Sequence, residues 1–426
     1  MKIKIAEQRR SATHIFLLCW LVYAFAYFSR MNISIILPEL QNVFGWSKAQ
    51  VGLIGSGFFW IYGAGHLVNG LIGDKVSGRW FVFAGTILIA GANILFGFAA
   101  SLVAMIIIWS LNGYFQSMIW SPMIRILTHW FDDQSQSRVS TGISTSMVGG
   151  YLLAWGLTGW FIKSWGWQAG VWIPGLVMLA FSLFWVTGIR DFPGTDERSA
   201  ASTPVVHHKA GLTLGKLIKK TGLSYLMIAN MSKGIVKEGI TLWGPLYIME
   251  KQGFGMDSSL WLILLVPIMN LFGFLLTGWM ADRMQNREAV ILSILFVASG
   301  FSCYGLLVFA HTSTLTCVLL LGLASSLLHG TNVLLSAAIP MKFKRYNRTS
   351  AVAGILDSSS YLGAGASAAL SGLIIDAFGW NGVMTFWTLT LAAGVLSLIR
   401  YRLFERGQGQ KRILARPGAA VEEKAK

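Results

Sequence analysis

Five ionisable side chains lie inside long apolar stretches of the sequence. Arg30, Lys233 and Lys237 are cations, and Glu238 and Asp357 are acids. An ionisable group within a membrane is rare and marks a functional site by default. A guanidinium stays charged and can hold a phosphate or carboxylate group with two parallel hydrogen bonds. These residues predict an anion-binding site, the alternative for Arg30 being a structural pair with a buried carboxylate.

The spacing of the cations supports this prediction. Tyr23, Tyr27 and Arg30 are separated by four and three residues, which puts them on one face of a helix. Lys237 follows far along the chain, and Lys233 precedes it by one helical turn on the same face. We expect Arg30 and Lys237 to face each other across a cleft, with Lys233 as a further ligand contact.

The two acids leave several roles open. An acid in the cleft repels a dianion, so Glu238 and Asp357 either neutralise a cation or carry a coupling proton. Asp357 is one candidate partner for Lys233, which would take Lys233 out of ligand binding.

Composition predicts the elements that hold these residues. Hydrophobic residues make up 54% of the 426-residue chain and charged residues 12%, against about 25% charged in a soluble protein. Long apolar runs exclude an outer-membrane barrel, whose strands alternate every second residue. A membrane-spanning helix needs about 20 apolar residues. The segments that qualify are 13–37, 51–73, 80–99, 102–124, 139–162, 169–189, 222–247, 258–280, 289–310, 313–340, 350–375 and 381–400.

The basic residues predict how these helices are oriented. With both termini cytoplasmic, 28 of the 34 Lys and Arg residues lie at cytoplasmic ends, and only Lys48, Lys163 and Lys251 lie on the opposite side. This asymmetry predicts a multi-pass protein of the cell (inner) membrane with both termini in the cytoplasm. It also accounts for the net charge of +16, so no nucleic-acid partner is expected.

The widest polar interruption predicts two halves. We expect an N-terminal six-helix bundle at 1–190, a cytoplasmic linker at 191–221, a C-terminal six-helix bundle at 222–402 and a basic cytoplasmic tail at 403–426.

A short loop motif occurs once in each half. Gly70-Leu-Ile-Gly-Asp74-Lys75 follows the second segment, and Gly278-Trp-Met-Ala-Asp282-Arg283 follows the eighth. Repeated helical bundles are typical of transporters, whose substrate sites lie near the midplane between the repeats. We expect these loops to latch the cytoplasmic face through Asp74, Arg79, Asp282 and Arg283.

The loop signature at 70–79 resembles that of the major facilitator superfamily. Within that superfamily, the chain resembles the organophosphate–phosphate antiporter family. The matching stretches are Tyr27-Phe-Ser-Arg30, Gly113-Tyr-Phe-Gln-Ser-Met-Ile-Trp120-Ser-Pro122, His129-Trp-Phe131, Ser144-Thr-Ser-Met147 and Gly234-Ile-Val-Lys237.

This resemblance implies both a fold and a site. The fold is an all-α membrane protein with 12 transmembrane helices in two pseudo-symmetric six-helix bundles. Members of the family exchange sugar phosphates or glycerol phosphate for inorganic phosphate by alternating access, at a site holding two basic residues. In this chain those residues are Arg30 and Lys237. The expected partners are a small anionic substrate, inorganic phosphate or a proton as coupling ion, and the lipid bilayer, with the protein as a monomer.

The same resemblance adds candidate contacts, each with a structural alternative. His66 stands one turn from Tyr62, in a helix that often carries a Lys at this point. His329 stands where relatives have a Tyr, and Tyr361 matches a family aromatic residue. Ser146 replaces a His found in some glycerol-phosphate members, as it does in a member of the sugar-phosphate type, which favours sugar phosphates.

The predicted function is secondary active transport of an organic phosphate ester (a sugar phosphate or glycerol phosphate) in exchange for inorganic phosphate by alternating access. The alternatives are a proton-coupled symporter of a sugar acid or sulfonate, and a transporter-like receptor for sugar phosphate. We find no catalytic constellation, so no enzyme activity is expected. The three cysteines lie in separate apolar runs, and neither a metal nor a cofactor is expected.

Overall fold

Helices make up every regular element in the described part of the chain. The structure, a computed structural model, describes residues 2–73, 76–131, 133–189, 214–252, 256–284, 287–309, 313–341 and 349–414. The first half holds α1 (Lys2–Met31), α2 (Ile33–Phe44), α3 (Lys48–Gly73), α4 (Gly78–Phe96), α5 (Leu102–Gln116), α6 (Trp120–Trp130), α7 (Asp133–Trp165) and α8 (Ala169–Gly188). The second half holds α9 (Leu214–Thr221), α10 (Leu223–Gln252), α11 (Met256–Arg283), α12 (Glu288–Phe309), α13 (Thr314–Asn332), the π-helix η1 (Val333–Ala338), α14 (Ile339–Met341) and α15 (Thr349–Leu414).

The expected membrane segments correspond to these helices in order. Within the described residues, nine helices are long and apolar enough to cross a membrane. The helix pairs α1–α2 and α5–α6 each form one path with a short break, and α15 contains two segments separated by the left-handed Gly379. Helices α7 and α10 have the length for a crossing but carry more polar residues than the others. The prediction of an all-α membrane fold is confirmed.

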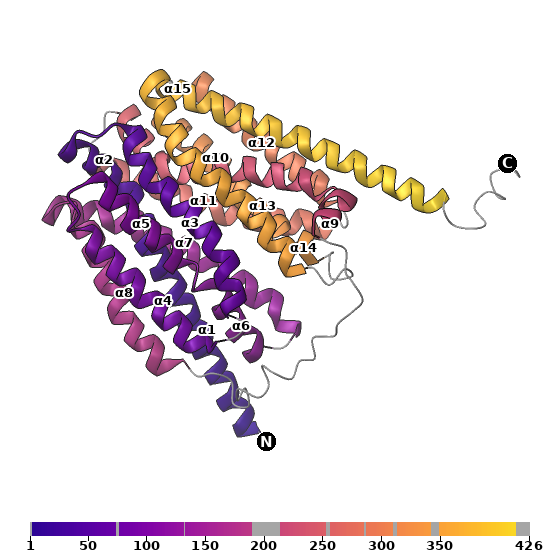
Figure 1. Cartoon of the computed structure of the whole chain (residues 1–426), viewed down its shortest axis with the longest axis horizontal. Coiled ribbons are helices and arrows are strands. Elements are labelled where there is room, and N and C mark those ends of the chain that lie inside the picture. The colour runs from indigo at the N-terminus through magenta and orange to yellow at the C-terminus, as the bar shows by residue number, and fades with distance from the viewer. Residues whose placement is uncertain are drawn as a thin grey trace, which may run out of the picture.

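Helices of the two halves gather on opposite sides of the molecule (Figure 1). The predicted linker at 191–221 lies mostly outside the described residues, although its last part forms α9. The predicted tail begins as helix rather than coil, because α15 continues to Leu414 and projects beyond its neighbours (Figure 1). Its sequence there is rich in Arg, Leu and Gln, which favour helix. The domain boundaries themselves stay predictions.

The halves pack most closely where α3 lies against α15. A Cβ added to Gly52 would lie 2.5 Å from the carbonyl oxygen of Ala368, so only glycine allows this approach. The Ser56 hydroxyl donates to the Gly365 carbonyl at 2.6 Å and accepts from the Ala369 amide at 3.1 Å. These two backbone groups are four residues apart in one helical turn, so a side chain from one half completes the bonding of a helix in the other.

Candidate functional site at the interface of the two halves

Arg30 is buried among aromatic rings. Its side chain is 3% exposed, and its guanidinium carbon lies 4.4 Å from the ring centre of Tyr62, 5.0 Å from Phe58, 5.2 Å from Tyr27 and 5.7 Å from Phe59. These rings stabilise the cation through their negative faces. No described carboxylate lies within ion-pair distance of Arg30, and its buried Nε has no acceptor. The structural pairing considered as the alternative is therefore absent from the described residues.

A set of buried amides fixes the backbone that carries Arg30. The Asn32 side chain stands at the break between α1 and α2 and donates to Asn93 Oδ1 at 3.2 Å and to the Gly170 carbonyl at 2.9 Å. Asn93 and Asn112 in turn donate to the Ser29 carbonyl, at 3.1 and 3.3 Å. The chain on both sides of Arg30 is thus tied to α4, α5 and α8, which holds the guanidinium in one place.

The tyrosines of α1 lie together, in agreement with their spacing. The ring centres of Tyr23 and Tyr27 are 5.2 Å apart. Tyr27 also contacts Tyr151 of α7 at 5.5 Å, and Tyr151 contacts His329 of the second half at 6.2 Å. Sequence reasoning missed Tyr151. The available signal was its position in the unusually polar α7, five residues after Ser146.

A second aromatic contact joins the halves beside Arg30. The Tyr62 and Tyr361 rings meet edge to face at 4.7 Å, and His66 stacks on Tyr361 at 5.8 Å. His66 also meets Tyr62 at 4.4 Å. The structure therefore brings these three predicted residues together, on the face of α3 turned toward α15.

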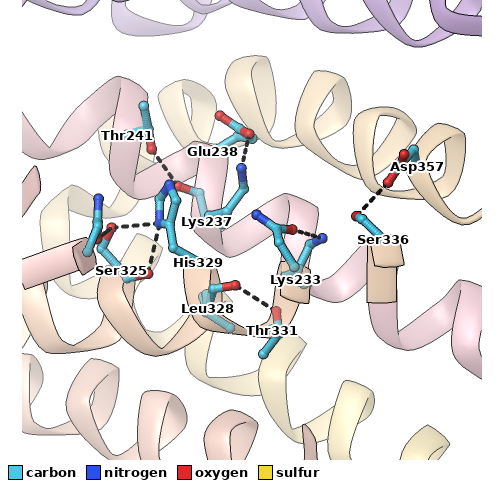
Figure 2. A network of polar contacts seen from close by, with 12 residues as sticks. Lys233, Lys237, Glu238, Thr241, Ser325, Leu328, His329, Thr331, Ser336 and Asp357 are labelled. Carbon is cyan, nitrogen blue, oxygen red and sulfur yellow. Dashed lines mark hydrogen bonds and ion pairs between the residues drawn. The ribbon is translucent and has the colours of Figure 1, made fainter. Parts of the chain in front are cut away.

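The two lysines of α10 have different partners. Lys237 forms an ion pair with Glu238, the next residue in the chain (Figure 2). Lys233 is 2% exposed and donates to Asn332 Oδ1 at 2.7 Å. No ion pair joins Lys233 to Asp357, which was one of the two alternatives for this lysine. Asn332, at the end of α13, accepts its hydrogen bond instead.

Asp357 instead accepts a hydrogen bond from a residue of η1. The Ser336 hydroxyl donates to Asp357 Oδ1 at 2.8 Å. This contact is separate from the Lys237–Glu238 pair (Figure 2). The π-helical turn of η1 widens the backbone at this point, and such turns are frequent at functional sites.

His329 and Ser146 are bonded to their own helices. His329 Nδ1 lies 2.9 Å from the Ser325 carbonyl and 3.3 Å from the Ser325 hydroxyl (Figure 2). The Ser146 hydroxyl donates to the Ile143 carbonyl at 2.5 Å. Both side chains are buried, and these local bonds are the structural alternative to a ligand role.

Both halves line a small cavity next to Arg30. Its volume is about 20 Å³, room for about one water molecule. Helices α1, α2, α3 and α5 contribute Arg30 and Phe58 among others, and α10 contributes Thr241 and Leu242. Thr241 lies one turn beyond Lys237 and donates to its carbonyl at 2.9 Å. The free donor of Arg30 and the charged turn of α10 therefore meet at one interface.

The predicted loop latch is only partly described. Asp74 lies outside the described residues. Arg79 donates to the Val186 carbonyl at 2.8 and 2.5 Å, so it joins the start of α4 to the end of α8 within one half. Asp282 and Arg283 are exposed, and Arg283 lies over the Trp279 ring at 5.7 Å. Among the described residues, none of these three shows a contact between the halves.

A group of charged contacts joins the halves where α3 begins, a region we call the Asp376 end. Asp376 of α15 accepts from the backbone amides of Lys48 at 3.3 Å and Ala49 at 2.9 Å. The Lys48 ammonium pairs with Glu250 of α10 at 3.0 Å, and Glu250 also accepts from Trp380 at 3.0 Å. Nothing in the sequence pattern indicated this group, because each residue is ordinary at a helix end.

Comparison with known proteins identifies the family. A model of the Major Facilitator Superfamily matches residues 19–337. The chain is 26% identical to the probable hexose phosphate transport protein of Chlamydia pneumoniae, over 91% of this chain and 90% of that protein. It is 27% identical to the glycerol-3-phosphate transporter of Bacillus subtilis (strain 168), over 92% and 93%. It is 26% identical to the membrane sensor protein UhpC of Escherichia coli (strain K12), over 92% of each chain.

Solved structures agree on the fold. A bacterial homolog of the human lysosomal transporter Spinster matches with a TM-score of 0.74, 16% identity, and coverage of 93% of this chain and 97% of that chain. Since the family model spans most of the sequence and the helical architecture agrees, the chain belongs to the major facilitator superfamily.

Proposed function

We propose that this protein is a secondary transporter that exchanges an organic phosphate ester for inorganic phosphate by alternating access. The substrate class follows from relatives that are named for hexose phosphate and glycerol 3-phosphate. In this proposal the protein works as a monomer in the cell (inner) membrane, with both termini in the cytoplasm.

The observation that carries the proposal is the unpaired state of Arg30. No acid among the described residues forms an ion pair with this buried cation, so its Nε donor is left for a ligand. A phosphate group would supply the acceptors that the guanidinium lacks and would fit its two-pronged geometry. Lys237 would supply the second cation, and Tyr23, Tyr27, Tyr62 and Tyr361 would line the site.

The same charge gives a reason for exchange. An empty carrier that closes around Arg30 must keep an uncompensated charge away from water, which is costly. A bound phosphate group compensates that charge and lets the halves move together. The loaded carrier therefore crosses freely while the empty one crosses slowly, which couples entry of one anion to exit of another.

Reconstituted vesicles test the exchange. Proteoliposomes loaded with phosphate receive labelled phosphate outside, with or without excess glucose 6-phosphate or glycerol 3-phosphate. We expect labelled phosphate to enter and one of the esters to block it. Absence of any phosphate flux would refute the proposal.

Arg30→Lys tests the role of the guanidinium. It keeps the charge but loses the bidentate contact, and we expect exchange to fall by about 10- to 100-fold, as for the loss of about 1.5–3 kcal/mol from a charged hydrogen bond. Arg287→Lys makes the same change at an exposed position and should leave exchange intact. Normal exchange by Arg30→Lys would remove Arg30 from the site.

A sensor is the second candidate, because one relative of similar identity is named a membrane sensor protein. Binding of phosphate esters by the purified protein, together with no flux in vesicles, would favour it. Uptake that follows a pH gradient and ignores internal phosphate would instead indicate a proton symporter of another organic anion.

A further inference from the structure

Glu238 is an acid that the proposed phosphate site does not explain. Among the described side chains it is the only fully buried carboxylate, at 2% exposure. Its Oε1 pairs with Lys237, but its Oε2 is shielded from solvent and has no hydrogen-bond donor. A buried carboxylate oxygen without a donor costs free energy, and native structures rarely retain one without a function.

The unsatisfied acceptor and the unsatisfied donor belong to the same interface. Arg30 Nε lacks an acceptor and Glu238 Oε2 lacks a donor. Arg30 and Thr241 line one cavity, and Thr241 is three residues after Glu238, on the same face of α10. A ligand held between the halves beside this cavity can therefore offer an acceptor to Arg30 and a donor to Glu238.

The balance of charge limits what that ligand can be. Among the described side chains of the site, three cations (Arg30, Lys233 and Lys237) face two acids (Glu238 and Asp357), which gives a formal net charge of one positive, and only Lys237 and Glu238 form an ion pair. A phosphate monoester is close to a dianion at neutral pH, so it compensates the charge of Arg30 and leaves about one negative charge in excess. A phosphate monoester that also carries an ammonium group has a net charge near minus one and matches it.

We propose that Glu238 binds a protonated amine of the substrate, so that the preferred substrates are amino-bearing organic phosphates. The phosphate group lies at Arg30 and Lys237, and the ammonium donates to Glu238 Oε2. This inference rests on the proposed function and narrows its substrate class. A sugar hydroxyl could also donate to Oε2, but it would leave the charge unbalanced and form a weaker bond than an ammonium does.

Matched competitors test this without any mutation. Phosphate-loaded vesicles are given labelled phosphate with glucosamine 6-phosphate or glucose 6-phosphate, which differ only in an ammonium against a hydroxyl. O-phosphoethanolamine and 2-hydroxyethyl phosphate form a second pair, with a different spacing of the two groups. We expect the amine to compete at least tenfold better in one pair or both. Equal competition within both pairs, with phosphate exchange intact, would overturn the inference alone.

Glu238→Gln then assigns the preference to one residue. It replaces the carboxylate by a neutral group of nearly equal size, and the tenfold preference for the amine should disappear. Glu39→Gln removes an acid from α2 and should preserve the preference. Retention of the preference in Glu238→Gln would refute the role of Glu238. If the variant does not fold, the competition experiment on the wild type still decides the substrate class. Absence of phosphate exchange in the wild type would refute both proposals.

Discussion

Asp376→Asn should weaken closure of the two halves at the Asp376 end. Helix α3 begins at Lys48, and its first turn is capped from both halves. Within its own half, the Ser47 hydroxyl accepts from the Gln50 amide at 3.2 Å and Gln50 Oε1 accepts from the Ser47 amide at 2.9 Å, a capping box. The amides of Lys48 and Ala49 donate to the Asp376 carboxylate of the other half. Opening this end must break both of these bonds.

The expected magnitude follows from the geometry. A carboxylate at a helix N-terminus stabilises by about 0.3–1 kcal/mol at an exposed site, and hydrogen bonds to charged groups contribute about 1.5–3 kcal/mol where water is excluded. Asp376 is exposed, and one of its two bonds is long at 3.3 Å. We therefore expect a loss of about 1–2 kcal/mol, which changes the ratio of closed to open molecules about five- to thirtyfold.

Spin labels on both sides of this contact measure that ratio. Val43→Cys in α2 and Phe378→Cys in α15 introduce labels at exposed positions in opposite halves, while the three native cysteines are buried. Pulsed electron paramagnetic resonance spectroscopy then gives the distribution of distances between the two labels. Asp376→Asn should increase the long-distance fraction, and Glu39→Gln, which removes an acid from α2, should leave it unchanged. An unchanged distribution in Asp376→Asn, or an equal shift in Glu39→Gln, would refute the cross-half cap.

Two further predictions concern packing within one half. A Cβ on Gly273 would lie 1.8 Å from the Ser326 carbonyl oxygen, whereas one on Gly278 would meet nothing within 4 Å. Gly273→Ala should therefore destabilise the protein by about 1–3 kcal/mol and lower its thermal unfolding temperature in detergent, while Gly278→Ala should not. Equal unfolding temperatures for the two variants would contradict this packing. Arg79→Gln should lower thermal stability by removing the bonds to the Val186 carbonyl, while the label distances at the Asp376 end stay unchanged; a shift in those distances would show that Arg79 also acts between the halves.

Local pattern was enough to predict the class of fold and the central cations. Apolar runs of membrane length require helices, because the backbone must bond to itself in a lipid environment. The spacing of Tyr23, Tyr27 and Arg30 fixes their common face through helical geometry alone, and the two tyrosine rings do meet. A charged residue inside such a run can be recognised from the sequence, because the free-energy cost of placing a charge in the membrane arises whichever helix lies beside it.

Partners from distant segments were beyond the sequence. From the sequence, either Asn332 or Asp357 could accept a hydrogen bond from Lys233. Only the position of α13 in the folded protein decides that Asn332 does. Arg79 belongs to a repeated loop signature, yet its guanidinium donates to the Val186 carbonyl at the end of α8, within its own half.

The contacts on which the proposed exchange rests depend on the relative placement of the halves. Sequence alone identified Arg30 as a buried cation, but its lack of an acid and its ring of aromatic side chains emerge only when α1 and α3 are packed. The cap that Asp376 gives to α3 joins residues more than three hundred positions apart. Helical periodicity determines the face of the helix on which each side chain lies, and tertiary packing determines which of those side chains contacts a partner.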